Sequence, residues 1–422
     1  MSKPYITILG KAVRAAARLR GNGSALPGLV VERIDPNFIK DTLASLPRGI
    51  VVISGTNGKT TTTKMVVELL ESQGLRVFTN RSGSNFTRGI AAALLGEIDI
   101  KGHLEADIAV LELDEAHAVT FVRTIPPTYS LILNVMRDQL DRFGEIDATA
   151  NLLRTIAVAT TDTVVLNRED QRIASLKESL SNQQVRYFGL SDDLLATFPS
   201  DDNLHGGTKL LNNLAGDVIL TKFADDTAVF RIGKQEVTTP LKLTGIYNVY
   251  NAAAALALVL AIVGDTVNRK TLIAALAEVT PAFGRGETLT IDGQPLELVL
   301  VKNPSGFRLG LQSFNPAGYA TMIAINDNYA DGRDMSWLWD VEFDSLRAGG
   351  VAKVAGIRAY DMALRLQYDE VPIAHVEKNL PKALRRFISE NTELPKRIYC
   401  TYTAMLALRR ELGKLTDVEP IG

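Results

Sequence analysis

The stretch VVISGTNGKTTTTKMVVELL, residues 51–70, decides the fold because it joins three kinds of local structure in a fixed order. An apolar run typical of a buried parallel strand comes first, a turn with Gly55 and Gly58 follows, and residues 60–74 predict a helix that ends at Gly74. Such a turn can surround phosphate oxygens with backbone N–H groups at the positive end of a helix dipole. The segment therefore predicts a nucleotide-binding α/β domain.

The turn GTNGKTT, residues 55–61, is a variant of the phosphate-binding loop pattern, because Ile53 stands where that pattern has its first glycine. Lys59 supplies a mobile positive charge suited to the β- and γ-phosphates, and Thr60 supplies a hydroxyl suited to Mg²⁺. We predict that the site binds ATP and Mg²⁺ and that Lys59 is catalytic. The loop residues predicted to bind the nucleotide are Gly55, Thr56, Asn57, Gly58, Lys59, Thr60 and Thr61.

Strand-like and helix-like segments alternate after residue 48, which predicts a parallel sheet with helices on both faces. Strands are expected at residues 49–54, 76–80, 106–114, 129–136 and 162–167, with short antiparallel strands in 215–243 and helices at 86–98 and 248–264. The pattern breaks near 280–289 and then resumes, with strands at 296–303, 321–327, 351–357 and 397–403. We predict a P-loop ATPase domain over residues 1–285 and a smaller Rossmann-like α/β domain over residues 286–422.

The composition is typical of a folded protein that does not bind nucleic acid. Hydrophobic residues make up 46% of the 422 residues and the formal net charge is −2, whereas proteins that neutralise nucleic-acid phosphates are usually basic. The single cysteine, Cys400, excludes an intramolecular disulfide and a cysteine zinc cluster. We see no signal peptide and expect no run of about 18–20 apolar residues that could span a bilayer. A soluble, cytoplasmic protein is expected.

Residues 4–20 predict a helix that carries Lys11, Arg14, Arg18 and Arg20. A basic amphipathic helix can lie on an anionic membrane surface. The alternative is a solvated helix packed on the main domain, and the sequence leaves both open.

Acidic side chains are expected near the phosphates, at the carboxyl ends of neighbouring strands. Glu112, Asp114 and Glu115 directly follow the apolar run at 106–111. We favour Glu112 as the second Mg²⁺ ligand beside Thr60, since Mg²⁺ keeps several waters and needs few protein ligands. The alternative is that these acids only solvate the end of the strand.

Polar residues after the next strands extend the predicted nucleotide site. Asn134 begins NVMRDQLDRFGE, Asn167 and Asp170 lie in LNRED, and Asn248 and Asn251 begin the helix at 248–264. Helix capping explains one of the last two asparagines more easily than both. The residues predicted here to hold the nucleotide are Asn134, Asn167, Asp170 and Asn248.

Together, GTNGKTT, LELDEA, NVMRDQLDRFGE, LNRED, GIYNVYNAAAA and FGRGE resemble the Mur ligase superfamily, which makes amide bonds by phosphorylating a carboxylate with ATP. The resemblance covers most of residues 30–290 and implies a Mur-ligase-like fold. Three features depart from it. About 50 residues precede the loop instead of a UDP-binding domain, Gln139 replaces a frequent histidine, and no DNPR-like signature is present.

The C-terminal motifs KNPSGF, INDNYADGRDMSWLWDVEF, GIRAYDMALRLQY and TYTAMLALRREL resemble the MurT family within that superfamily. Relatives often carry a four-cysteine zinc ribbon, for which residues 189–213 look like the replacement, so no zinc is expected. The resemblance implies that ATP activates the α-carboxyl of D-glutamate in the lipid II stem peptide and that ammonia converts it to D-isoglutamine. Substrate at the membrane surface implies a cytoplasmic protein peripheral to the inner face of the membrane.

The catalytic roles follow from this resemblance. Lys59 would stabilise charge on the transferring phosphoryl group, and Arg285 in FGRGE is predicted to reach the γ-phosphate or the substrate carboxylate, oriented by Glu287. Glutamine hydrolysis needs an activated cysteine, but Cys400 lies in the apolar run RIYCTYT and is expected to be buried. The ammonia is therefore expected from a partner, a GatD-type glutaminase.

The segment DGRDMSWLWD, residues 331–340, contains both tryptophans of the chain and follows an expected strand. A partner glutaminase that lacks an acid for its triad could take one from this loop, and we favour Asp334 over Asp331 and Asp340. Arg333, Trp337 and Trp339 are of the types enriched at interface hot spots. The alternative is that the loop contacts only nucleotide or substrate, or packs locally.

Lys302 and Asn303 in KNPSGF are predicted to lie at the same face and to contact substrate or phosphate, with an ordinary surface lysine as the alternative. Two other functions compete with the amidating ligase. One is a stand-alone ligase similar to folylpolyglutamate synthetase, which adds an amino acid without a glutaminase. The other is a P-loop scaffold that binds ATP without turnover.

Overall fold

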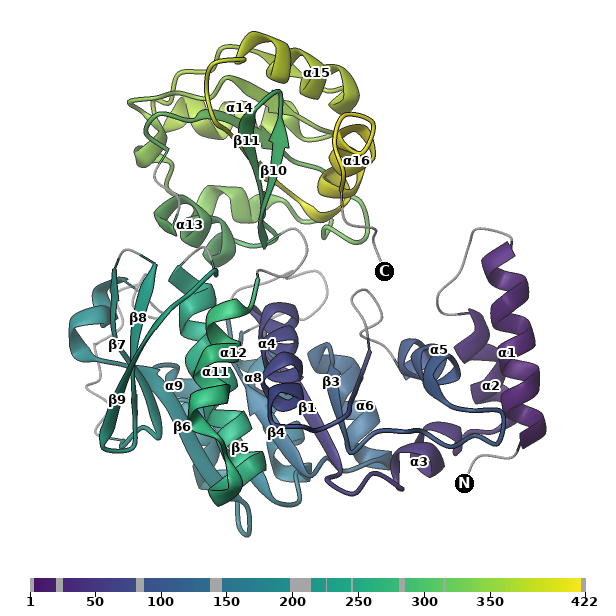
Figure 1. Cartoon of the computed structure of the whole chain (residues 1–422). Helices are drawn as coiled ribbons and strands as arrows, with labels where there is room; N and C mark the ends of the chain where they lie inside the picture. Colours follow the sequence, from purple (N-terminus) through teal and green to yellow (C-terminus); the bar gives the residue numbers. More distant parts are fainter. Residues whose placement is uncertain are drawn as a thin grey trace.

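The computed structural model describes residues 4–19, 26–80, 87–136, 146–197, 214–224, 226–243, 246–280, 285–313 and 316–418. Two sheets organise the described chain, and helices cover both faces of each sheet (Figure 1). We call the two halves the nine-stranded domain and the six-stranded domain after their sheets. The predicted α/β class is confirmed.

The nine-stranded sheet has the strand order β2-β3-β1-β4-β5-β6-β7-β8-β9. Neighbours from β2 to β7 are parallel, and β8 and β9 add an antiparallel edge. Every residue of β1, β3 and β5 is buried, which explains their continuous apolar sequences. The strands are β1 (Ile50–Ser54), β2 (Val77–Thr79), β3 (Ile108–Glu112), β4 (Tyr129–Ile132), β5 (Thr163–Asn167), β6 (Gln184–Leu190), β7 (Val218–Ala224), β8 (Thr227–Ile232) and β9 (Gln235–Pro240).

The two faces of this sheet bury alternate residues of each strand. Val51 and Ile53 of β1 face the core formed with α4 (Lys59–Ser72), α11 (Ile246–Val263) and α12 (Arg269–Glu278). Ile50 and Val52 face the core formed with the remaining long helices of the domain. The helices on that side and the short connecting helices are α1 (Pro4–Leu19), α2 (Leu26–Ile34), α3 (Phe38–Leu43), α5 (Thr87–Glu97), α6 (Glu115–Thr124), α8 (Ile146–Ala159), α9 (Gln171–Ala174), η1 (Ser175–Ser179), η2 (Asp192–Thr197) and η3 (Gly264–Thr266).

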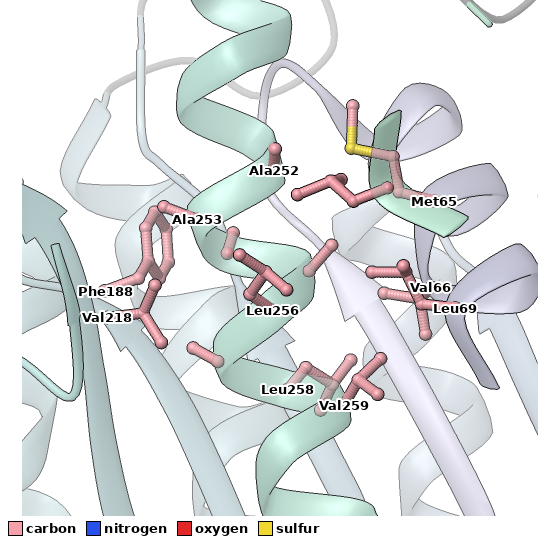
Figure 2. Packing of buried hydrophobic residues seen from close by; sticks show 14 of the residues in the cluster. Met65, Val66, Leu69, Phe188, Val218, Ala252, Ala253, Leu256, Leu258 and Val259 are labelled. Atoms are coloured by element: carbon pink, nitrogen blue, oxygen red, sulfur yellow. The ribbon is translucent and has the colours of Figure 1, made fainter. Parts of the chain in front are cut away.

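Helix α11 is the central helix of the first core. Figure 2 shows Met65 and Val66 of α4 on one side of it and Phe188 and Val218 of the sheet on the other. Contrary to the sequence expectation, the stretch Tyr247–Thr266 is long and apolar enough to cross a membrane, yet 72% of its most apolar window is buried inside the domain. Its apolar length is explained by the core that it fills.

The six-stranded sheet has the order β10-β11-β15-β12-β13-β14, and all pairs are parallel except the hairpin of β10 and β11. One face is covered by α13 and α14, the other by α15 and α16. The elements are β10 (Arg285–Ile291), β11 (Gln294–Leu300), α13 (Pro304–Ser313), β12 (Ala320–Ala324), η4 (Ser336–Asp340), η5 (Asp344–Leu346), β13 (Lys353–Ala355), α14 (Ala359–Tyr368), β14 (Val376–Glu377), α15 (Leu380–Glu390), β15 (Lys396–Cys400) and α16 (Tyr402–Leu412).

Most of the predicted elements are present, and the exceptions have a physical reason. β6 is not among the predicted strands, because it begins with the exposed polar residues Gln184 and Arg186 around a half-buried valine. The hairpin partner β10 lies where the sequence predicts only a break between domains. The predicted bounds 1–285 and 286–422 of the two domains stay a prediction.

Candidate active site

The phosphate-binding loop connects β1 to α4 at the carboxyl end of the nine-stranded sheet. Gly55 and Gly58 have φ values of +136° and +87°, which residues other than glycine rarely adopt. A Cβ atom on Gly55 would lie 2.9 Å from the backbone nitrogen of Asn134, and one on Gly58 would lie 2.7 Å from Oδ1 of Asn251. Gly58 is the N-cap of α4, and the N-terminal end of a helix favours an anion.

Lys59 is held at this loop by a buried ion pair. Its side-chain Nζ lies 3.1 Å from Oε1 of Glu115, and both residues are buried. The same ammonium donates to the backbone oxygens of Gly55 and Thr56. These contacts keep the positive charge inside the loop. The sequence suggests Glu115 as a metal ligand or as an acid that only solvates the end of the strand, and the structure shows it as the partner of Lys59.

Thr60 and Glu112 meet as the sequence predicts for a pair of metal ligands. The Thr60 hydroxyl donates to Oε1 of Glu112 at 2.9 Å, and the glutamate is buried. Two neighbouring ligands of an octahedral Mg²⁺ with bonds of about 2.1 Å are separated by about 3.0 Å, so two oxygens 2.9 Å apart fit one ion. Asp114 instead caps α6, because its carboxylate accepts a hydrogen bond from the backbone N–H of Ala116.

Asn80 fixes the backbone of Glu112 and was not predicted. Its side chain donates to the Glu112 carbonyl at 2.7 Å and accepts from the Glu112 N–H at 2.9 Å, and it is buried. The available signal is its position at the end of the expected strand at 76–80, beside the strand that ends in Glu112.

Asn134 braces the loop. Its side chain accepts from the Asn57 N–H at 2.9 Å and donates to the Asn57 carbonyl at 3.0 Å, and its own carbonyl accepts from the Thr56 N–H. The Thr56 hydroxyl in turn accepts from the Met136 N–H at 3.1 Å. Asn134 therefore lies at the loop, and the contacts that the structure shows position the loop. A direct contact with nucleotide stays a prediction.

Asn167 and Asp170 hold structural elements together. Asn167 donates to the Leu133 carbonyl at 2.7 Å and accepts from the hydroxyl of Tyr250, whose pKa is raised by burial, so that the hydroxyl stays a donor. Asp170 caps α9 and accepts from the Val135 N–H at 2.7 Å. Their predicted contacts with base or ribose stay predictions.

Asn251 of α11, which the sequence also singles out, lies against the loop. Asn251 is buried and is the residue that a side chain on Gly58 would meet, whereas Asn248 is half-buried one turn earlier. The sequence placed both at the start of one helix but gave no means to choose between them. The predicted role of Asn248 is untested.

Two residues of the six-stranded domain reach the same loop. Nζ of Lys302 donates to the Thr56 carbonyl at 2.9 Å. The side chains of Asn303 and Asn57 exchange two hydrogen bonds of 3.1 and 3.3 Å, and Asn303 is buried and also caps the first turn of α13 through the Gly306 N–H. The predicted residues 302 and 303 are therefore at the phosphate-binding loop, although they are far from it in sequence.

Comparison with known proteins identifies the family. The Mur ligase middle domain matches residues 53–259, and the MurT ligase C-terminal domain matches residues 300–405. A Streptococcus pneumoniae protein named lipid II isoglutaminyl synthase (glutamine-hydrolyzing) subunit MurT is 33% identical over 93% of this chain and 93% of its own length. The chain belongs to the MurT family.

A second MurT subunit, from Staphylococcus aureus, is 29% identical over 89% of this chain and 90% of its own length. The fold is also that of the MurF ligase from Thermotoga maritima in complex with ADP, with a TM-score of 0.67, 17% identity, and coverage of 90% of this chain and 84% of that one. As a member of the MurT family, the chain is an ATP-dependent ligase of peptidoglycan biosynthesis.

The MurT-type loop at 331–340 differs from its prediction at two residues. Asp331 is 1% exposed, and its carboxylate accepts from the Asn328 N–H and from both the N–H and the hydroxyl of Thr403. Burial raises the pKa of this carboxyl. Trp337 is 4% exposed and packs edge-on against Phe307 in the core of the domain. Trp337 is therefore a core residue, which corrects its prediction as an interface contact.

The other predicted residues of this loop face outward to different degrees. Trp339 is 49% exposed, Arg333 is exposed, and Asp334 and Asp340 are half-buried. Asp334 accepts from the Ser336 N–H at 2.9 Å, and the backbone carbonyl of Asp340 accepts from Arg308. Asp334 is therefore more accessible than Asp331.

Several predicted features lie at the limits of the described residues. Arg285 begins β10, but its side chain and residues 137–145, with Gln139, are outside the description. Glu287 forms an ion pair with Arg409, and its expected role in orienting Arg285 stays a prediction. Most of residues 189–213 is also outside the described residues, so the expected lack of zinc stays a prediction.

Cys400 is buried as predicted, and burial raises the pKa of its thiol.

Proposed function

We propose that this chain is the ATP-using subunit of a lipid II amidating enzyme. The observation that carries the proposal is the loop at which Lys59, Thr60 and Glu112 meet Lys302 and Asn303 of the other domain, in a chain that matches MurT subunits along most of its length. Amide synthesis by this route needs a carboxylate and a triphosphate held together, and a site between two domains can hold both.

In the proposed reaction, a carboxylate oxygen of D-glutamate attacks the γ-phosphorus of ATP, the bond from that phosphorus to the bridging oxygen breaks, and ADP leaves. The nitrogen of ammonia then attacks the carbonyl carbon of the acyl phosphate, the bond to the phosphate oxygen breaks, and loss of a proton gives the amide and inorganic phosphate. Lys59 would stabilise the charge on the transferring phosphoryl group, with Arg285 as the second predicted cation. Mg²⁺ held by Thr60 and Glu112 would neutralise phosphate charge.

A second protein is proposed to supply the ammonia. Cys400, the only cysteine in the sequence, lies in β15 with no exposed surface, and its raised pKa disfavours the nucleophilic thiolate. A glutaminase that uses cysteine must therefore be another chain, and a GatD-type subunit is the partner that we propose.

The surface proposed for that partner lies on the six-stranded domain. Tyr360, Leu364 and Tyr368 are 63%, 49% and 69% exposed, and their spacing of four residues places them along one side of α14. Trp339 packs edge-on against Tyr368 with ring centroids 5.1 Å apart, and the Arg365 guanidinium lies 5.5 Å from the Trp339 ring. We call the four exposed residues Trp339, Tyr360, Leu364 and Tyr368 the aromatic stripe. Exposed apolar and aromatic side chains gathered in this way support a protein interface.

Asp334 is proposed to complete the catalytic triad of the glutaminase. It stands in the same loop as Trp339 of the aromatic stripe and is more accessible than Asp331. The buried carboxylate of Asp331 already accepts three hydrogen bonds, one from Asn328 and two from Thr403 that tie its loop to α16, which favours a structural role.

Reconstitution tests the proposed function. The purified chain is mixed with a GatD-type glutaminase, lipid II, ATP and glutamine, and the stem peptide is analysed by mass spectrometry. The expected product has the small mass decrease of a carboxyl converted to an amide, and its formation requires both proteins. Addition of a whole glutamate residue would instead indicate the stand-alone ligase, and an unchanged peptide without ATP hydrolysis would indicate the scaffold.

A further inference from the structure

The N-terminal helix α1 has an unusual exposed face. Over residues 4–16, whose exposure the structure describes, every exposed residue is non-polar. Tyr5, Ile8 and Leu9 are 62%, 57% and 43% exposed, and three alanines continue the face along the helix. The outward face of a helix in a water-soluble protein is normally polar and charged. Here the outward face is apolar instead.

The orientation of α1 is fixed by close packing on its inner side. Ile6 and Thr7 are buried, and Gly10 lies so close to α2 and α5 that a Cβ atom on it would be 2.8 Å from Val31 and 2.5 Å from Leu95. The guanidinium of Arg14 lies against Gly96 of α5. The helix therefore cannot turn its apolar face inward without losing these contacts.

Charge around this face indicates what could cover it. The first 31 residues contain five lysines and arginines and no acidic residue, whereas the whole chain has 46 basic and 48 acidic residues. Lys11 and Arg14 are half-buried at the side of the exposed face. Apolar side chains bordered by positive charge complement a bilayer of anionic phospholipids, which attracts the lysines and arginines and takes up the apolar side chains.

We propose that α1 docks the protein on an anionic membrane surface, with Tyr5, Ile8 and Leu9 inserted at the level of the lipid headgroups. A second copy of the chain fits this face less well, because two such helices would bring their basic residues together without an acid in the same segment. Figure 1 places α1 at the end of the nine-stranded domain beyond α2 and α5, apart from α14. The inference goes beyond the proposed function, and if that function holds, docking would bring the site to a substrate anchored in the bilayer.

Sedimentation with vesicles tests the proposal on the full chain. The wild type is expected to sediment with vesicles of phosphatidylcholine mixed with phosphatidylglycerol, and less with phosphatidylcholine alone or at high salt. The double variant Ile8→Gln, Leu9→Gln is expected to bind the anionic vesicles about tenfold more weakly, or weaker still. The control variant Ile100→Gln changes another exposed isoleucine, 67% exposed and outside α1, and should bind as the wild type does.

Three results would overturn the docking proposal. They are absence of wild-type binding to the anionic vesicles, equal binding by the double variant, and a wild-type dimer that the double variant converts to a monomer. Thermal melting followed by circular dichroism should be the same for all three proteins, since the changed side chains are exposed. Amidation of detergent-dispersed lipid II separates the two proposals, because its failure alongside normal vesicle binding would contradict only the proposed function.

Discussion

The loop at 55–61 and the loop at 331–340 both follow a buried parallel strand of their own sheet, β1 and β12. In the first loop, backbone conformation sets the geometry, through the positive φ of Gly55 and Gly58. In the second, neighbouring side chains go in opposite directions, with Asp331 and Trp337 buried and Trp339 exposed. A loop shaped by its backbone can be recognised from residue types, whereas a loop shaped by side-chain packing requires knowledge of what surrounds it.

The largest effect is expected at the first loop. The substitution Lys59→Ala should reduce ATP-dependent amidation by at least about a thousandfold, because it removes the charge that stabilises the transferring phosphoryl group. Glutamine hydrolysis by the partner should continue. The control Lys64→Ala removes a partly exposed lysine from the same helix and should keep near-normal amidation, measured as amidated stem peptide formed per minute. Comparable rates in the two variants would contradict the assigned site.

A change in the second loop should affect the other half-reaction, the hydrolysis of glutamine. Asp334→Asn is expected to lower glutamine hydrolysis by the complex about a hundredfold, since a triad base without its acid partner is poorly oriented. Hydrolysis of ATP with free ammonia as the nitrogen source should remain. Asp340→Asn is the matched control from the same loop, and normal ammonia release by the Asp334 variant would refute its role.

The two tryptophans of the second loop are expected to have different roles, one in binding and one in stability. Trp339→Ala should weaken glutaminase binding about thirtyfold, the effect of losing roughly 2 kcal/mol at an interface hot spot, without a change in melting temperature. Trp337→Ala should instead lower the free energy of unfolding by about 3–5 kcal/mol, because it leaves a cavity in the core. Calorimetry of binding and thermal melting distinguish these effects. The control Leu415→Ala removes an exposed residue of the same domain, and equal loss of binding in it and the Trp339 variant would remove the case for the aromatic stripe.

The contrast between the loops also explains what the sequence could predict. The strand, turn and helix at 51–70 are confirmed, and Thr60 and Glu112 meet as expected, because the ends of adjacent parallel strands meet at one edge of a sheet. The pairing of Lys59 with Glu115 and the position of Asn251 against Gly58 depend on side-chain directions within helices. The burial of Trp337 depends on Phe307 from α13, which nothing near residue 337 in the sequence reveals.

The smallest effect is expected where the six-stranded domain meets the first loop. Lys302→Ala removes the hydrogen bond of a charged group to the Thr56 carbonyl, and such bonds contribute enough for an expected loss of about tenfold in kcat/KM for ATP. Asn303 should still hold Asn57, so the domains remain in contact and the loss should stay well below that of Lys59→Ala. Lys270→Ala, on an exposed part of α12, is the control. An unchanged kcat/KM would mean that Lys302 only occupies the surface of the loop, and a loss as large as that of Lys59→Ala would place it in direct contact with the phosphates.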